Sequence, residues 1–145
     1  MSNKATAVVA WESLFRAQVA VMRTLTHEFP AHDISFNEYD VMFNISRQPG
    51  RSLRLRDLNK HVLLTQPSVS RLVDRLVSRG FLDKITDPSD GRGAIVTLTD
   101  AGYDAYRRVA VEHAESIRQR VGTKLDTAEL TELARLCDKL RDGES

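Results

Sequence analysis

The polar and basic side chains of residues 65–75 are the part of this sequence best suited to contact a large polar ligand. Apolar residues recur there at the i, i+3, i+4, i+7 spacing of an amphipathic helix, at Val69, Leu72, Val73 and Leu76. At about 100° per residue, the other side chains point away from that stripe: Pro67, Ser70, Arg71, Asp74 and Arg75. The first half of this outer face is small and polar, so base edges can approach it closely. An arginine there can reach a guanine edge or a phosphate.

A short hairpin with one long basic side chain is predicted after this helix. Residues 82–86 and 94–98 read as strands, and residues 87–93 (DPSDGRG) are dense in turn formers. We expect Arg92 to enter the minor groove of A·T-rich DNA and Asp90 to pair with it and hold its direction. A basic helix backed by a charged hairpin is typical of a winged helix-turn-helix on duplex DNA.

Charge is unevenly distributed along the chain. The protein has a net charge of +1, but residues 47–92 hold ten Lys and Arg against five Asp, so that segment is +5 and the remainder −4. A basic middle between acidic arms is typical of a nucleic-acid-binding module within a larger scaffold. Two plainer interpretations stay open. The charges are scattered at random over solvated faces, or Arg71 and Arg75 merely pair with Asp74 and Asp57.

The elements that position these residues follow from helical periods and caps. We expect helices over residues 5–29, 36–47, 55–62, 65–79 and 99–122, a sixth helix opening at Asp126, and a short strand over residues 52–54. Ser35 with Glu38, and Asp126 with Glu129, have the spacing of capping boxes, and Gly80 is the expected C-terminal cap of the fourth helix. The predicted fold is mainly α with a small antiparallel β-wing (α+β), in one domain over residues 1–145. A winged helix-turn-helix lobe covers residues 35–98, and a helical dimerisation region covers residues 1–34 and 99–145.

Composition excludes several classes of protein. No apolar run approaches the ~20 residues of a membrane span. Trp11 and Glu12 break the N-terminal apolar run before a signal-peptide core forms, so we expect a cytoplasmic location. The single cysteine, Cys137, excludes an intrachain disulfide and a cysteine-based zinc cluster. No phosphate-binding glycine loop, G-x-S-x-G or H-E-x-x-H is present, so we expect neither an enzyme nor a bound cofactor.

The first, fifth and sixth helices carry wide apolar faces that need a partner. We expect part of this surface to form a homodimer interface, and the monomeric bundle is the alternative. The candidate interface residues are Val8, Val121, Leu130, Leu133, Cys137 and Leu140. Two-fold symmetry would present two recognition helices about 34 Å apart, one turn of duplex.

From about residue 35 to residue 102 the chain resembles the MarR family of winged-helix regulators. Three segments carry the resemblance, in addition to Leu58: SVSRLVDRL at 68–76, RGFL at 79–82, and DPSDGR at 87–92 followed by VTLTDAG at 96–102. Many members have two adjacent arginines at the wing tip, whereas here the first is Gly91. The resemblance implies a homodimer on a pseudo-palindromic operator, usually a repressor. Many members are released by small aromatic or phenolic anions, or by oxidants.

These inferences give two sets of candidate site residues. The expected DNA contacts are Arg54, Thr65, Gln66, Pro67, Ser68, Ser70, Arg71, Arg75, Asp90 and Arg92. The residues that could line an effector crevice are Trp11, Phe15, Arg16, His27, His32 and Tyr39.

Three alternatives remain for the function. Oxidant sensing is disfavoured because Cys137 falls on an apolar stripe, where its thiol ionises poorly. Zinc sensing would need His27 and His32, which do not share a helix face, together with His113 and Glu28, so we expect no metal site. A winged helix used only for protein contacts would not need the +5 middle.

Overall fold

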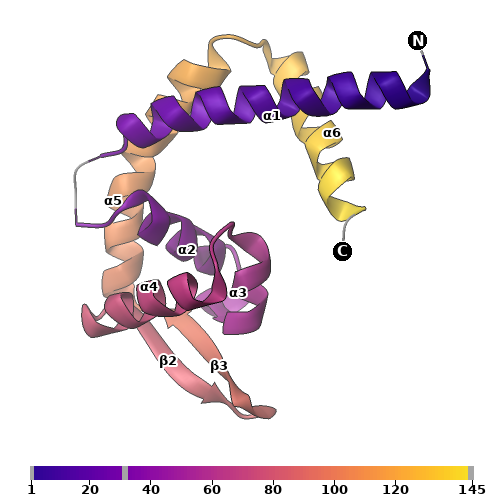
Figure 1. Ribbon diagram of the computed structural model, residues 1–145. Helices are drawn as coiled ribbons and strands as arrows, with labels where there is room; N and C mark the ends of the chain where they lie inside the picture. The colour runs from indigo at the N-terminus through magenta and orange to yellow at the C-terminus, as the bar shows by residue number, and fades with distance from the viewer. Residues whose placement is uncertain (1, 31–32, 144–145) are drawn as a thin grey trace. The chain divides into compact units, whose positions relative to one another are not determined.

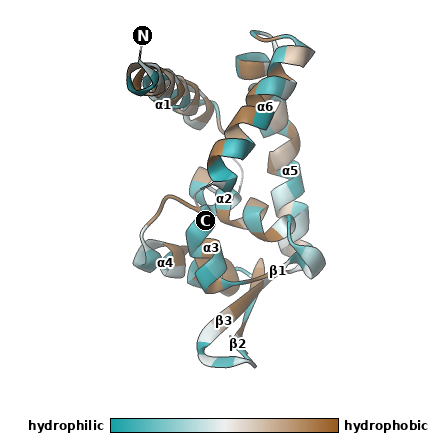
Figure 2. Ribbon diagram, turned by 90° about the vertical axis from the view of Figure 1, so that its right-hand side faces the viewer, coloured by the Kyte–Doolittle hydropathy of each residue, from teal (hydrophilic) through white to brown (hydrophobic). Residues whose placement is uncertain are grey.

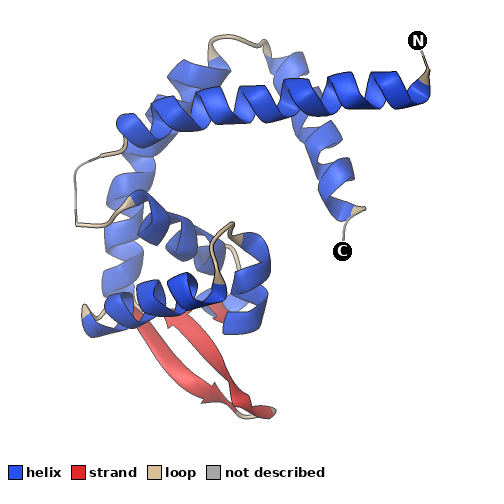
Figure 3. Ribbon diagram, viewed as in Figure 1, coloured by secondary structure: helices blue, strands red, loops and turns tan. Residues whose placement is uncertain are grey.

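The computed structural model describes residues 2–30 and 33–143, and the chain divides into two compact units. Unit 1 comprises residues 1–29 and 112–145, and unit 2 comprises residues 30–111. Figures 1 and 3 show the elements, which are mainly helical. In chain order they are α1 (Asn3–His27), α2 (Phe36–Ser46), the 3-10 turn η1 (Pro49–Arg51), β1 (Ser52–Arg54), α3 (Leu55–His61), α4 (Gln66–Ser78), β2 (Leu82–Asp87), β3 (Asp90–Leu98), α5 (Asp100–Ile117), the π-helical turn η2 (Arg118–Gly122) and α6 (Thr127–Asp142).

Hydrogen bonds confirm the predicted capping boxes at the starts of α2 and α6. At α2 the Ser35 hydroxyl accepts from the Glu38 N–H at 3.2 Å, and the Glu38 carboxylate accepts from the Ser35 N–H at 2.8 Å. Asp126 and Glu129 form the same reciprocal pair at α6, with distances of 2.8 and 3.0 Å. Each pair satisfies backbone donors that the first helical turn leaves unpaired. The fold class, mainly α with a small antiparallel β-wing, is confirmed.

The core of unit 2 is built around the apolar stripe of α4. Val69, Val73 and Leu76 are fully buried and Leu72 is 6% exposed, as the spacing predicts. These side chains belong to a core shared with α2, α3 and the sheet, whose other buried members include Val41, Met42, Ile45, Leu58, Leu82 and Val96. The sheet is antiparallel with strand order β1-β3-β2. Burial of the stripe therefore fixes which face of α4 remains outside.

The β2–β3 hairpin, the wing of the fold, is longer than the sequence predicts. The expected loop over residues 87–93 is wrong, because β2 continues to Asp87 and β3 begins at Asp90. Asp87 pairs with Asp90 across a connection of only Pro88 and Ser89. Ladder hydrogen bonds use the backbone, so glycines and polar residues join a strand despite their turn-forming composition. Figure 2 shows that the hairpin tip is hydrophilic, whereas β3 near the helices is hydrophobic.

A buried carboxylate anchors the base of this tip. Asp87 is 4% exposed and accepts hydrogen bonds from the Ser89 N–H at 2.9 Å and the Ser89 hydroxyl at 2.8 Å. The Arg54 Nε lies 3.0 Å from the other Asp87 oxygen, and a terminal nitrogen of Arg54 donates to the Ser89 hydroxyl at 3.2 Å. The Ser89 hydrogen bonds, with Arg54 as a smaller contribution, hold the pKa of Asp87 below its ordinary value of 3.8. The wing is thereby tied to the end of β1.

Two glycines, Gly80 and Gly102, allow the start of α5 to lie close to the end of α4. Gly80 has φ +79°, in the left-handed region, and its carbonyl accepts from the Thr99 hydroxyl at 2.7 Å. The same hydroxyl accepts from the Gly102 N–H at 3.0 Å, so Thr99 caps the start of α5. Gly102 is buried, and a Cβ there would overlap the backbone carbonyl of Phe81.

Unit 1 is held together by few buried side chains. Leu25 is buried in α1, and His113, also buried, packs edge-on to the Phe29 ring at 5.3 Å. The Arg120 guanidinium binds the Glu28 carboxylate through two hydrogen bonds, of 2.9 and 2.5 Å. Within the described residues, no helix is long and apolar enough to cross a bilayer.

We predict that Gly102→Ala destabilises the protein by about 1–3 kcal/mol or more, because the added methyl meets backbone that cannot move aside cheaply. Urea unfolding measures the loss. Gly91→Ala is the matched control, since a Cβ at Gly91 meets no atom within 4 Å, and its effect should stay within about 0.5 kcal/mol. Equal midpoints for the two variants would contradict the contact.

We predict that Asp87→Asn lowers the urea midpoint at pH 7, and that its difference from wild type disappears in acid. The folded pKa of Asp87 lies below 3.8, so the charged group contributes stability above its unfolded pKa. That contribution is lost as the pH falls through the folded pKa. Asp83→Asn, on an exposed strand position without an ion pair in the described chain, is the control. A difference that persisted unchanged at pH 2 would refute the assignment.

Candidate nucleic-acid interface

The exposed face of α4 matches the prediction made from its period. Gln66, Pro67, Arg71 and Arg75 are exposed, and Ser68 and Ser70 are half-buried. Thr65 is the N-cap of α4, and its hydroxyl accepts from the Ser68 N–H at 3.3 Å. The N-terminal half of α4 therefore presents small polar side chains, with arginines on the turns that follow.

The arginines of α4 are free of acidic partners. The Asp74 carboxylate binds Lys84 at 3.2 Å, and Asp57 lies 3.5 Å from Lys60. The pairing of Arg71 and Arg75 with these two carboxylates, the plainer interpretation of the sequence, is therefore wrong. Arg71 donates to the Ser68 hydroxyl at 3.3 Å, and neither arginine makes an ion pair in the part of the chain that the structure describes. Both guanidinium charges remain available to a ligand.

The far end of α4 is fixed by an arginine that the sequence does not single out as a tether. The Arg79 guanidinium donates to the Glu38 carboxylate at 3.3 Å and to the Asp33 carbonyl at 2.5 Å, and it lies 4.7 Å from the centre of the Phe81 ring. Glu38 is itself 8% exposed and closes the cap of α2. This end of α4 is thus tied to the start of α2, which leaves the N-terminal end to meet a ligand.

A polar cleft of about 500 Å³ separates α4 from the wing. Its walls come from the start of α3, the outer face of α4 and both strands of the hairpin, which Figure 1 shows projecting past these helices. The lining includes Arg54, Arg56, Asn59, Gln66, Ser70, Lys84, Asp87, Asp90 and Arg92. Four basic side chains therefore face two carboxylates, and the cleft is open to an anionic polymer.

The tip of the wing is ordered by Asp90 in a way that differs from the expected ion pair. Its carboxylate accepts from the backbone N–H of Arg92 at 3.1 Å, and it forms no ion pair with the Arg92 guanidinium in the described chain. An Asx-type hydrogen bond stabilises the local backbone. Asp90 thus shapes the tip and leaves the Arg92 charge unneutralised.

Arg54 is placed at the cleft but is already engaged, since Asp87 and Ser89 bind its guanidinium. Several other side chains of the cleft wall were not among the residues predicted from sequence, including the possible hydrogen-bond donors Arg56, Asn59 and Lys84. Arg56 and Asn59 are three residues apart on α3, opposite the buried Leu58, so their spacing alone could have marked them as one face. Lys84 could not be found this way, because its place depends on the pairing of β2 with β3.

The effector candidates fall in different units. Trp11, Phe15, Arg16 and His27 lie on α1 in unit 1, where the Trp11 and Phe15 rings are 5.7 Å apart and both are exposed. Arg16 pairs with Glu12 at 3.6 Å. His32 lies outside the described residues.

Tyr39 belongs to unit 2, where its ring stacks on Tyr106 with centroids 5.5 Å apart. Burial, with a smaller contribution from Tyr106, raises the pKa of Tyr39 to about 12. Its hydroxyl is therefore a neutral hydrogen-bond donor at every physiological pH.

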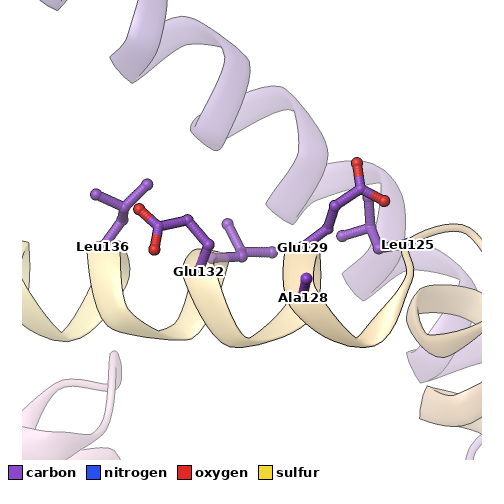
Figure 4. A pocket seen from close by; sticks show the side chains of 6 residues that line it. Leu125, Ala128, Glu129, Glu132 and Leu136 are labelled. Carbon is purple, nitrogen blue, oxygen red and sulfur yellow. The ribbon is translucent and has the colours of Figure 1, made fainter.

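The dimer candidates lie in unit 1 beside open apolar hollows. One hollow of about 700 Å³ lies between α1 and the segment from η2 to α6, and Val121, Leu133 and Cys137 line it. A second, of about 350 Å³, reaches Trp11 and Leu140. Figure 4 shows Glu129, Glu132 and Leu136 projecting to one side of α6, with Leu125 in the segment just before the helix, around a third hollow. Of the other candidates, Val8 is exposed and Leu130 is half-buried, so this surface is apolar and is left partly uncovered by the described residues.

Sites for oxidants or metals gain little support from the geometry. Cys137 is half-buried among apolar side chains of these hollows. Glu28, a candidate zinc ligand, is bound by Arg120, which lowers the pKa of the carboxyl. No group of three or more His, Cys, Asp or Glu side chains within residues 2–30 and 33–143 is placed to hold a metal ion.

Comparisons with known proteins agree with this geometry. Residues 32–93 match the sequence model of the MarR family. Over 144 residues the chain is 29% identical to YhbI, an uncharacterized HTH-type transcriptional regulator of Bacillus subtilis, covering 97% of this chain and 92% of YhbI. Among solved structures it is similar to Sco3205, a MarR family transcriptional regulator from Streptomyces coelicolor in complex with DNA, with TM-score 0.78, 27% identity, and coverage of 96% of this chain and 88% of Sco3205. It is also similar to the transcriptional regulator PcaV from the same organism, in complex with its natural ligand, with TM-score 0.71, 27% identity, and coverage of 91% and 92%.

The family model covers most of the winged lobe, and the similarity to YhbI and Sco3205 extends through the helical arms. Members of this family are transcriptional regulators, which confirms the expectation that the chain is not an enzyme. Residues 32–93 match the MarR family of winged-helix, DNA-binding transcriptional regulators, and the similarity to regulators of this kind extends over nearly the whole chain.

Proposed function

We propose that this regulator is a homodimeric repressor that binds a pseudo-palindromic operator in the cytoplasm and is released by a small aromatic or phenolic ligand. One observation carries the DNA-binding part. The polar N-terminal half of α4, the unpaired Arg71 and Arg75, and the unneutralised Arg92 at the wing tip all border the cleft or the outer face of α4. If α4 lies in a major groove and the wing tip enters the adjacent minor groove, all of these side chains meet the DNA.

The individual contacts follow from chemistry. Ser70 and Arg71 read bases in the major groove, with Thr65, Gln66, Pro67 and Ser68 close to the DNA at the start of α4. Arg75, one turn further along, binds phosphate. Arg92 enters the minor groove, where a narrow A·T-rich tract concentrates negative potential. Arg54 contributes by holding the wing through Asp87.

The homodimer is supported by the apolar surface of unit 1. Leu133, Leu136 and Leu140 are 42–61% exposed on α6, and Trp11 and Val8 are more than half exposed on α1. Contiguous apolar surface of this kind is unusual on a monomer and marks an interface. A second copy of the chain is the partner that also supplies a second recognition helix, as a two-fold operator requires.

The effector proposal has a narrower basis. PcaV, which is 27% identical, is solved with its natural ligand, so a protein of this fold and similar sequence binds a small molecule. The candidate residues Trp11, Phe15, Arg16, His27 and Tyr39 offer aromatic faces and cationic or hydroxyl donors suited to an aromatic anion. A thermal-shift screen of phenolic acids, followed by release of bound DNA in a gel shift, tests this part.

A winged helix used only to bind proteins is the competing function, and the salt dependence of binding separates the two. Duplexes selected from a random library by the wild-type protein provide the probe. Binding to DNA through several phosphate contacts gives an affinity that falls steeply with salt. Failure to enrich any duplex would remove the DNA-binding proposal.

We predict that Arg71→Ala weakens binding to the selected duplex by about 1–3 kcal/mol and relaxes base preference at one position in each half-site. Affinities for a panel of single-base variants of the duplex measure both effects. A uniform loss over the whole panel would make Arg71 a phosphate contact. No loss at all would mean that α4 is not the recognition helix.

We predict that Leu133→Asp dissociates or unfolds the dimer, because an unpaired charge in an apolar seam is costly. Sedimentation at micromolar concentration gives the mass, and circular dichroism distinguishes dissociation from unfolding. Leu63→Asp, at a leucine that is 99% exposed in unit 2, is the control and should stay dimeric. A stable wild-type monomer would overturn the two-fold model.

A further inference from the structure

The cleft between α4 and the wing lies where one strand of bound DNA would run. If α4 occupies a major groove and Arg92 the adjacent minor groove, the sugar-phosphate backbone that separates the two grooves must pass between them. The space between these elements is the polar cleft of about 500 Å³. This placement rests on the proposed function, and it makes the sugar-phosphate backbone of DNA the ligand of the cleft walls.

Three of the six charged side chains that line the cleft, Arg54, Lys84 and Asp87, already form ion pairs within the protein. Asp87 binds Arg54 at 3.0 Å, and Asp74, outside the cleft, binds Lys84 at 3.2 Å. Arg56 is different, because it is exposed, lines the cleft and makes no ion pair or hydrogen bond in the described chain. Between the outer face of α4 and the wing tip, Arg56 is therefore the basic side chain on this wall without a direct ion pair among the described residues, although its charge makes a small contribution to lowering the pKa of Asp87.

Asn59 supplies a second unused group beside Arg56. It follows Arg56 by three residues on α3, so the two side chains share one face of the helix, and both line the cleft. Its amide nitrogen, the group that can donate to phosphate, lies on this cleft-lining side chain, whereas its Oδ1 is an acceptor that is buried without a hydrogen-bond partner in the described chain. An amide N–H and a guanidinium are both donors suited to a phosphate oxygen.

We propose that Arg56, assisted by the side-chain amide of Asn59, holds a phosphate of the DNA strand that runs between the groove read by α4 and the groove entered by the wing. Because this contact is to the backbone, it carries no base information. Its role is to fix the register of α4 and the wing on the duplex. Lys84 and Arg54 flank the same strand with charges shared by their carboxylate partners.

The test uses the full-length protein and the duplex that it selects from a random library. Arg56→Ala should lower affinity by about tenfold or more per half-site, since one charge-assisted contact is lost. It should reduce the slope of log K against log salt by about 0.9 per protomer. The loss should be equal for all single-base variants of the duplex. Asn59→Ala should reduce affinity less and leave the slope nearly unchanged.

A matched control is Arg108→Ala, which removes one exposed charge from α5 outside the cleft and should change neither quantity appreciably. Neutral methylphosphonates placed singly along the duplex then locate the contact. The substitution at the clamped phosphate should weaken wild type but add nothing to Arg56→Ala.

Each of three results would overturn the clamp: an unchanged slope in Arg56→Ala, methylphosphonate effects that add to it at every position, or a loss confined to one base pair. Wild-type protein that selects no duplex would instead overturn the proposed function itself. The two failures are thus distinguishable.

Discussion

Burial of one stripe of α4 is the constraint on which the rest of the site depends. Val69, Val73 and Leu76 have no exposed surface, so rotation of α4 about its axis would bring polar side chains into a packed core. The outer face is therefore fixed without any contact made by the outer side chains themselves. Arg71 and Arg75 need no structural partner and keep their charges for a ligand.

Ion pairs within the protein determine which basic side chains remain available to a ligand. Three of the five acidic residues of the basic segment form ion pairs within the protein: Asp74 with Lys84, Asp57 with Lys60, and Asp87 with Arg54. The first two pairs are exposed and contribute little to stability. Their consequence is that the basic side chains without partners gather on α4, at Arg56 and at the wing tip. A net charge of +1 for the whole chain conceals this arrangement, because pairing within the fold matters more than the total.

Local features of the fold were predictable from sequence, and features that depend on pairing across the chain were not. Caps at Ser35, Thr65 and Asp126 and the buried stripe of α4 depend on residues a few positions apart, so period and cap chemistry identify them. The lengths of β2 and β3 depend on their mutual register, which composition does not encode. The engagement of Arg54 by Asp87, 33 residues later, could not be predicted for the same reason. Within the site, α4 was correctly oriented from sequence, whereas the cleft-lining face of α3 was missed.

In the proposed complex, α4 and the wing occupy adjacent grooves at two symmetric half-sites. Hydroxyl-radical footprinting of the selected duplex tests this claim most directly, because the radical attacks the backbone sugars from the minor groove. The proposed complex should give a symmetric pattern with half-site centres about 10 base pairs apart, or a multiple of one helical turn, each flanked by a protected minor groove that loses protection in Arg92→Ala. A single protected patch without symmetry, or flanking protection that Arg92→Ala leaves unchanged, would contradict it.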